Sequence, residues 1–169
     1  MQNDTLFSEK QRFTQWWIWL ILLAINGIFA TAFYVQVING QTFGDKPMSN
    51  NEIVIVGSLI VSITVLFRYF SLETIIKEDG IYVRFFPIQI VYKKYTWDKI
   101  QKVFVRQYKP ITEYGGWGLR YGIFGAGKAL NVSGNMGLQI IFNNNSKLLI
   151  GTQKPSELKT CINKINTDL

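Results

Sequence analysis

Two long apolar runs near the N-terminus restrict what this chain can fold into. Residues 16–38 contain no charged side chain over 23 positions, and a helix of that length, at about 1.5 Å of rise per residue, crosses a hydrocarbon core of roughly 30 Å. Residues 53–70 form a second run, whose single charge, Arg68, lies near its end and can extend to the headgroups. The sequence therefore predicts two transmembrane helices joined by an extracytoplasmic loop at residues 39–52.

Residues within and beside these runs fit a membrane hairpin. Interfacial aromatic side chains flank the first run, at Trp16, Trp17, Trp19 and Tyr34. Asn26 lies in the middle of the run, where hydrocarbon offers its amide no hydrogen-bond partner. We therefore expect it to bond to a hydroxyl group of the second run, which has three: Ser58, Ser62 and Thr64.

The alternative for the first run is a secretory signal peptide, because residues 30–32 (Ala-Thr-Ala) match a cleavage site. The segment before the run, residues 1–15, is long and net neutral, and the run continues beyond residue 32, which favours a retained helix. Cations flank the two runs at Lys10, Arg12, Arg68 and Lys77, whereas the intervening loop has only Lys46. We predict a multi-pass protein of the cell (inner) membrane with a cytoplasmic N-terminal segment and a cytoplasmic C-terminal domain.

That domain, residues 71–169, carries the whole net charge of +7, with 14 Lys and Arg against 7 Asp and Glu. The chain has no histidine and one cysteine, Cys161, so it lacks the usual ligands of zinc, copper and haem and can form no internal disulfide. We expect no cofactor and no metal site. With 48% hydrophobic and only 17% charged residues, the chain is also too apolar for a disordered protein.

Alternating apolar and polar residues predict a β-rich domain. Asp79-Gly80 is a strong turn signal between two such runs, and Pro87 ends or bends the second. Predicted strands outside the glycine-rich segment cover residues 72–77, 81–86, 88–96, 102–108, 137–142 and 147–151. Residues 110–137 hold eight of the fourteen glycines, interleaved with aromatic side chains that favour burial, so short bent strands are expected there.

A C-terminal helix follows these strands. Pro155 and Glu157 fit its first turn. Its apolar face recurs at three- and four-residue spacing, at Leu158, Cys161, Ile162, Ile165 and Leu169. We expect this face to cover one open end of the sheet structure, with Cys161 acting as a small buried hydrophobe and not as a reactive thiol.

This order of elements and several local motifs resemble bacterial pleckstrin-homology-like (PH-like) domains. The segment Trp97-Asp98-Lys99-Ile100 is similar to a tryptophan-acidic-x-isoleucine motif of that family. Four later segments resemble the second half of the family's domain: GGWGLRYG, GKALNVSG, GLQIIF and IGTQKPSEL, at residues 115–122, 127–134, 137–142 and 150–158. The likeness covers residues 71–166. It implies a membrane-anchored α+β fold in which a transmembrane helical hairpin precedes a small β-barrel of about seven antiparallel strands with one C-terminal capping helix. It also implies binding to lipids, to peptides or to further copies, without enzymatic activity.

Two other patterns are weaker on inspection. Residues 122–129 match G-x-x-x-x-G-K, but Ala129 replaces the Ser or Thr that holds Mg²⁺ in a P-loop, and no helix pattern follows. Aromatic and basic residues alternate across residues 82–106, but alternate positions on a strand fit a sheet core better than a platform for nucleic-acid bases. We predict no nucleotide or nucleic-acid partner.

Two groups of residues are candidates for contact with a partner. The first is basic and is expected to face the anionic cytoplasmic leaflet: Arg68, Lys77, Lys93 and Lys94. Each nearby cation gains about 1 kcal/mol there, although positive-inside bias alone would also produce such an excess. The second is a ligand or partner surface on the glycine-rich segment: Tyr114, Trp117, Arg120, Tyr121 and Lys128.

The sequence thus favours a non-enzymatic integral membrane protein that presents a basic PH-like domain at the cytoplasmic face. Its partner would be a protein, including a second copy in a homo-oligomer, or anionic lipid headgroups. The alternative is a membrane enzyme or enzyme subunit acting on lipid, with Glu113 and Lys128 as participants. A pocket that gathers Glu113 with a basic residue would favour the enzyme.

Overall fold

The computed structural model describes residues 5–122 and 125–168. The chain folds into two compact units: a helical unit, Thr14–Tyr69, and a globular unit that combines the N-terminal residues up to Phe13 with Phe70–Leu169. Leu169 of the predicted helix face and residues 123–124 of the glycine-rich segment lie outside the described residues. The globular unit is therefore built from two stretches of chain that flank the helical unit.

The helical unit contains two long apolar helices. The first helix, α1 (Trp16–Ala32), continues into a π-helical segment, η1 (Phe33–Ile38), and α2 spans Asn50–Tyr69. With 23 and 20 residues and few charges, both helices are long and apolar enough to cross a membrane. Most of their large apolar side chains are exposed, so this unit has almost no apolar core of its own. The predicted pair of long apolar helices is confirmed.

Polar side chains fix the middle of this hairpin and the start of α2. Asn26 Nδ2 donates to Thr64 Oγ1 at 2.8 Å, which confirms the expected bond between the amide and a hydroxyl group of the second helix. Ser49 and Glu52 form a capping box: the Ser49 N–H donates to Glu52 Oε2 at 2.7 Å, and the Glu52 N–H donates to Ser49 Oγ at 3.3 Å. This cap starts α2 at Asn50, ahead of the apolar run that was predicted to begin at Ile53.

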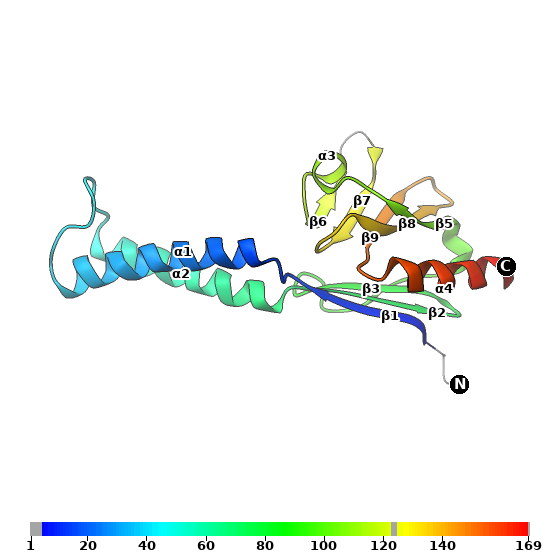
Figure 1. Ribbon diagram of the computed structural model, residues 1–169, viewed down its shortest axis with the longest axis horizontal. Helices are drawn as coiled ribbons and strands as arrows, with labels where there is room; N and C mark the ends of the chain where they lie inside the picture. Colours follow the sequence, from blue (N-terminus) through cyan, green and yellow to red (C-terminus); the bar gives the residue numbers. More distant parts are fainter. Residues whose placement is uncertain (1–4, 123–124, 169) are drawn as a thin grey trace. The chain divides into compact units, whose positions relative to one another are not determined.

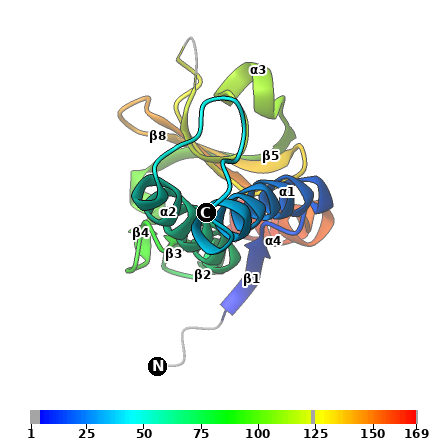
Figure 2. The ribbon, with the colours of Figure 1, turned by 90° about the vertical axis from the view of Figure 1, so that its left-hand side faces the viewer.

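The globular unit contains two sheets followed by a C-terminal helix (Figures 1 and 2). Sheet A has the order β1-β2-β3-β4, and its strands span Thr5–Arg12, Ser71–Lys77, Gly80–Phe86 and Lys93–Tyr95. Sheet B has the order β5-β8-β9-β7-β6, and its strands span Ile100–Gln107, Met136–Phe142, Lys147–Gly151, Lys128–Asn131 and Gly118–Tyr121. Three short or terminal helices complete the unit: η2 (Trp97–Lys99), α3 (Pro110–Tyr114) and α4 (Pro155–Asp168). The predicted α+β layout is confirmed.

The two sheets are not closed into a barrel, so that part of the prediction is wrong. The strand expected at residues 88–96 pairs only over Lys93–Tyr95, because the preceding residues form a loop. The chain then turns at η2 and starts sheet B, so β4 and β5 are edges of different sheets. The expectation of about seven antiparallel strands also fails, because β1 was not predicted and β7 pairs with β9 in parallel.

The strand β1 lies in the N-terminal segment, for which no structure was predicted. It pairs antiparallel with β2, and Arg12 lies opposite Ser71 in the ladder. The helical unit is thus inserted between two neighbouring strands of one sheet. Alternate residues of β1 are buried, among them Phe7, Glu9 and Gln11, so this strand is an integral part of the globular unit.

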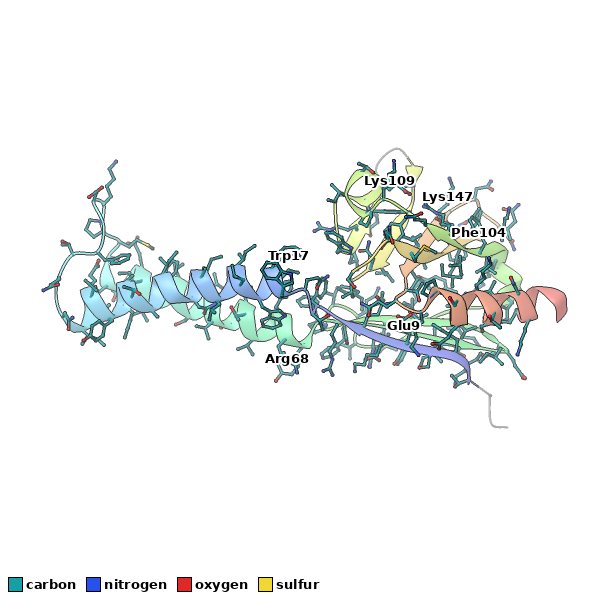
Figure 3. The ribbon with its side chains drawn as sticks, in the orientation of Figure 1. Glu9, Trp17, Arg68, Phe104, Lys109 and Lys147 are labelled. Carbon is teal, nitrogen blue, oxygen red and sulfur yellow. The ribbon has the colours of Figure 1, made fainter. Side chains whose placement is uncertain are left out.

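Two buried polar side chains of β1 also tie sheet A to sheet B. Glu9, labelled in Figure 3, accepts hydrogen bonds from Thr152 Oγ1 at 2.7 Å and from the Gln153 N–H at 2.8 Å, both in the segment between β9 and α4. Gln11 Nε2 donates to Gly151 O at 2.7 Å. Because a buried polar group left without a partner costs about 1–3 kcal/mol, loss of β1 would weaken the contact between the sheets.

The core lies between the two sheets and α4, which is drawn in red in Figure 1 and contacts β1, β5 and β8. The helix buries the predicted apolar face: Leu158, Cys161, Ile162 and Ile165. Each fully buried aliphatic side chain contributes about 1.5–3 kcal/mol. Burial also raises the pKa of the Cys161 thiol, as expected for a structural cysteine.

A buried carboxylate links three strands of sheet A. Glu73 in β2 lies 2.6 Å from Lys10 Nζ of β1 and 2.5 Å from Arg84 Nη2 of β3, and it also accepts a hydrogen bond from the Tyr92 hydroxyl. Burial alone would raise its pKa, but these three donors outweigh burial and lower the pKa of Glu73 to about 2. The carboxylate therefore stays ionised in the folded protein far into the acidic range.

We expect acid to destabilise sheet A through Glu73. Its pKa is about 2 in the folded protein and about 4.3 in an unfolded chain, so its stabilising effect is complete above about pH 5.5 and is lost as the pH falls toward 2. The loss approaches about 3 kcal/mol. In the Glu73→Gln variant, the free energy of unfolding should be lower at neutral pH and less sensitive to acid, as measured by chemical unfolding of the full chain in detergent. Glu78→Gln, in the exposed β2–β3 turn, should keep the wild-type acid sensitivity; equal behaviour of the two variants would contradict the shifted pKa.

The insertion of the helical unit predicts that the globular unit can be isolated only with β1. Phe13 and Phe70 end the two stretches, and their ring centroids lie 6.3 Å apart, so a short glycine-containing linker can replace Thr14–Tyr69. We expect this fusion to be a folded, water-soluble protein with a cooperative thermal transition by near-UV circular dichroism. Residues 70–169 alone should aggregate or melt well below it, because they lack the partner strand of β2. Equal stability of the two proteins would mean that β1 is dispensable.

Candidate functional site

A cleft of about 540 Å³ opens where the edge of sheet A meets the β8–β9 turn of sheet B. Five lysines and no acidic residue line it: Lys93, Lys94, Lys99, Lys128 and Lys147. The remaining lining combines polar side chains of the turn with an apolar floor: Asn143, Asn144, Ser146, Tyr95, Phe142 and Leu148. Converging cations on a concave surface concentrate anions. We refer to this site as the lysine cleft.

Backbone pairing brings the five lysines together from four elements. They come from β4 (Lys93 and Lys94), η2 (Lys99), β7 (Lys128) and β9 (Lys147, labelled in Figure 3). The Asn143 N–H donates to Lys99 O at 3.0 Å and holds the β8–β9 turn beside η2. Gly127 lets the start of β7 approach β9, because a Cβ at this position would lie only 2.3 Å from Lys147 O. The site therefore depends on the pairing of segments far apart in the sequence.

Most of the positive charge in the cleft is not neutralised by the protein. Lys94 forms an ion pair with Asp79 at 2.6 Å. The other four lysines form no ion pair with any residue that the structure describes: Lys93, Lys99, Lys128 and Lys147. Like charges gathered in one concavity repel each other, and a bound anion would relieve that repulsion.

Aromatic rings lie beside three of the five ammonium groups, including that of Lys94, whose Nζ is 5.4 Å from the ring centroid of Tyr82. Lys93 Nζ lies 5.3 Å from the ring centroid of Tyr95, and Lys128 Nζ lies 5.7 Å from that of Tyr121, both within the range of cation–π attraction. The rings of Tyr95 and Phe142 are 5.3 Å apart and form part of the floor. Burial raises the pKa of Tyr95, so its hydroxyl stays neutral and adds no negative charge to the cleft.

The cleft unites residues that the sequence analysis had assigned to two groups. Lys93 and Lys94 were expected to face the leaflet, and Lys128 was expected on the ligand surface. The sequence did not indicate Lys99 or Lys147 as site residues. Each lies at the border of a turn, where the sequence has no periodic signal, and only the contact between η2 and the β8–β9 turn brings them together.

The other two residues of the predicted basic group lie elsewhere. Arg68 is exposed in the last turn of α2, in the helical unit. Lys77 ends β2, at the opposite end of the strand from Ser71, and its Nζ lies 5.5 Å from the ring centroid of Tyr82. Neither residue lines the lysine cleft.

A second hollow, of about 530 Å³, contains Glu113 and is marked by Lys109 in Figure 3. Arg106 holds the Glu113 carboxylate with two hydrogen bonds, Nη2 to Oε2 at 2.7 Å and Nη1 to Oε1 at 3.3 Å, and the Lys109 N–H donates to Oε1 at 2.7 Å. The Arg106 guanidinium outweighs partial burial and lowers the pKa of Glu113. A carboxylate stabilised in its ionised form by three donors suits a structural tie and does not suit a general acid.

The predicted partner surface of the glycine-rich segment is not one surface. Tyr114 is only 2% exposed, so its side chain is not available to a partner. Trp117 lines the second hollow, and the exposed Arg120 donates from Nε to Trp117 O at 2.9 Å. Tyr121 is 74% exposed and lies beside Lys128. Of the five residues, therefore, Lys128 lines the lysine cleft and Tyr121 adjoins it.

No group of three or more His, Cys, Asp or Glu suited to a metal ion occurs in residues 5–122 and 125–168. Comparison with family models, with curated proteins and with solved structures found no match to this chain. Among the residues that the structure describes, the lining of the lysine cleft contains no carboxylate, histidine or cysteine side chain, and its charged groups are all lysines.

Replacement of Glu113 should affect stability because Arg106 would lose its main partner. We expect Glu113→Gln to lower the free energy of unfolding by about 1–3 kcal/mol, measured by chemical unfolding of the full chain in detergent. Glu157 provides the matched control: it also pairs with a cation, Lys154, but its side chain is 63% exposed. Glu157→Gln should change stability by less than about 0.5 kcal/mol. An unchanged stability in Glu113→Gln would mean that the carboxylate is not a structural tie.

Proposed function

We propose that this chain is a membrane-anchored, non-enzymatic binding protein whose lysine cleft takes a phosphate-bearing anion. The two apolar helices cross the cell (inner) membrane, both termini lie in the cytoplasm, and a PH-like domain made of β1 and residues 70–169 is displayed at the cytoplasmic face. One observation carries the proposal: four lysines that form no ion pair with the described residues converge on one concave surface. The phosphate belongs either to a soluble molecule or to a lipid headgroup.

The chemistry of the cleft favours phosphate over a singly charged anion. A phosphate monoester carries up to two negative charges and three strong acceptor oxygens, which several lysines can satisfy from different sides. The side chains of Asn143, Asn144 and Ser146 add further polar groups to the lining. A volume of about 540 Å³ lies within the range of small-ligand sites, and the aromatic floor suits an apolar part of the same ligand.

The pairing of β1 with β2 supports the membrane topology. Because Arg12 lies opposite Ser71, both ends of the helical unit must emerge on the same side of the bilayer, which requires an even number of crossings. Two spanning helices satisfy this condition. Cleavage after residue 32, as in a signal peptide, would remove β1 together with its buried Glu9 and Gln11. The bias of flanking cations favours the cytoplasm as the common side.

The order of the elements supports the resemblance to PH-like domains. Two sheets followed by a helix that packs on them match the layout that the resemblance implies, apart from the closed barrel. The motif at residues 97–100 forms the turn between the sheets, where Trp97 Nε1 donates to Lys77 O at 3.3 Å. Families of this fold mostly bind ligands and are not enzymes, which favours a binding function.

The alternative of a lipid-acting enzyme has less support. Its two candidate participants line different hollows, Glu113 the second hollow and Lys128 the lysine cleft. A basic residue, Lys109, does line the second hollow with Glu113, but Arg106 already binds the carboxylate through both oxygens. Both oxygens of Glu113 are therefore occupied, and the carboxylate is poorly placed to accept or donate a proton in catalysis.

The double variant Lys99→Gln/Lys147→Gln tests the cleft. We expect it to bind pyrophosphate about tenfold or more weakly than the wild type, because two of the cations that attract the anion are lost. Binding would be measured by calorimetry with the full chain in nanodiscs of neutral lipid, at two salt concentrations, and should weaken at the higher salt. Lys159→Gln/Lys164→Gln, on the exposed face of α4, removes the same charge and should bind like the wild type.

Two further arms identify the source of the phosphate. In the first arm, the chain is placed in nanodiscs that contain phosphatidylglycerol. If this lipid weakens the binding of soluble pyrophosphate in the wild type but not in Lys99→Gln/Lys147→Gln, the ligand is a lipid headgroup. If the lipid does not weaken pyrophosphate binding, the ligand is a soluble phosphate. Equal affinity of the cleft variant and the α4 variant would reject the cleft as the binding site. Tight binding of a glutamate-rich peptide with no binding of pyrophosphate would instead assign the cleft to an acidic protein segment.

A further inference from the structure

The loop between β3 and β4 exposes an unusual set of apolar side chains. Ile88, Ile90 and Val91 are 59%, 71% and 80% exposed. In the described part of the globular unit, the other exposed large hydrophobic side chains are scattered singly, at Leu6, Ile111 and Tyr121. Single exposed hydrophobic residues are normal on a protein surface, whereas a cluster within one short loop indicates a contact with something apolar.

Polar contacts hold this loop against the sheet with its apolar side chains outward. The Gln89 N–H donates to Phe85 O at 2.8 Å, and the Phe85 N–H donates back to Gln89 Oε1 at 3.3 Å. Arg84 Nη1 donates to Ile90 O at 3.2 Å. Tyr92, at the end of the loop, donates to the buried carboxylate of β2. Several polar groups of the loop thus bond to the protein, while the side chains of Ile88, Ile90 and Val91 are exposed.

The register of sheet A fixes where this loop lies. Phe86, the last residue before the loop, is opposite Ser71, and Ser71 is opposite Arg12. Paired residues on adjacent strands have Cα atoms about 5 Å apart. Ser71 comes two residues after the end of α2 at Tyr69, and Arg12 comes four residues before the start of α1 at Trp16. The covalent connection alone therefore keeps the loop close to the points where the chain passes into the two apolar helices.

We propose that residues 87–91 insert into the headgroup and acyl boundary of the bilayer that the helices cross, as a third membrane contact of the chain. This inference rests on the membrane-spanning part of the proposed function. Lipid is the occupant because the two connections hold the loop at the bilayer surface, where exposed Ile and Val side chains can leave water.

A fluorescent probe on the loop tests the insertion. The full chain would carry Cys161→Ala, to remove its native cysteine, and Ile90→Cys labelled with an environment-sensitive dye. It would be reconstituted in vesicles of phosphatidylcholine and phosphatidylglycerol with brominated acyl chains. We expect the bromine to quench the dye, and iodide in the aqueous phase to leave it bright. Glu78→Cys, in the exposed turn at the opposite end of β2 and β3, is the matched control and should show the reverse pattern.

A third probe position separates this inference from the membrane assignment. Leu59→Cys lies in the middle of α2. Quenching by brominated lipid at Leu59→Cys but not at Ile90→Cys would overturn the insertion of the loop and leave the spanning helices intact. No quenching at Leu59→Cys would overturn the membrane assignment, and the inference would fall with it.

A last variant tests whether the loop reaches the lipid because of its apolar side chains or only because the chain joins sheet A to the two apolar helices nearby. Val91→Cys, labelled in the same way, would be compared with and without the pair Ile88→Ser and Ile90→Ser. Both isoleucines are largely exposed, so far-UV circular dichroism should be unchanged. We expect the serine pair to abolish most of the quenching by brominated lipid. Full retention of quenching would mean that the connections alone hold the loop at the surface, and would overturn the insertion.

Discussion

The pairing of β1 with β2 is the constraint on which the rest of the structure depends. It places the whole helical unit between two adjacent strands, so sheet A forms only when the helices bring the chain back beside its starting point. At that end of the sheet, the rings of Phe13, Phe70 and Phe85 pack on one another, with centroids 5.9–6.5 Å apart. Farther along β1, the buried Glu9 and Gln11 bond to the segment after β9. One strand thus ties together both sheets and both ends of the helical unit.

Several carboxylates of the globular unit hold secondary-structure elements together, and the unit has more lysines than carboxylates to pair with them. Glu73 bonds to side chains of β1, β3 and the β3–β4 loop, and Glu113 ties α3 to β5 through Arg106. Both carboxylates have a lowered pKa because their cationic donors outweigh burial. Residues 71–169 have 14 basic and 7 acidic side chains, so many cations must remain uncompensated. The fold places several of these cations close together in the lysine cleft.

Features set by neighbouring residues could be predicted from the sequence, and features set by distant pairing could not. The apolar helices and the β2–β3 hairpin follow from local hydropathy and from Asp79-Gly80. In contrast, the sequence does not predict β1, because its partner strand lies about sixty residues away. Its buried face also contains Glu9 and Gln11, and polar residues are normally expected at exposed positions. Ile88 to Val91 have high strand propensity, yet they form a loop, because propensity does not specify whether a partner strand is available. The cleft could not be predicted for the same reason, since Lys99 and Lys147 are brought together by the contact between η2 and the β8–β9 turn, segments more than forty residues apart.

The exposed β3–β4 loop and Lys94 of the lysine cleft lie at different positions along sheet A. The exposed loop begins after Phe86, at the end of the sheet that joins the helices. Lys94 lies opposite Tyr82, four residues farther along β3, which at about 3.3 Å per residue is roughly 13 Å from Phe86. This separation exceeds the Debye length of about 8 Å at physiological salt, so under the proposed topology the charge of the leaflet would act on Lys94 only weakly. If the loop contacts the bilayer as proposed, its apolar side chains would serve membrane attachment and the lysines of the cleft would be left to an anion. That division of roles favours a ligand from the aqueous phase over a headgroup of the same bilayer.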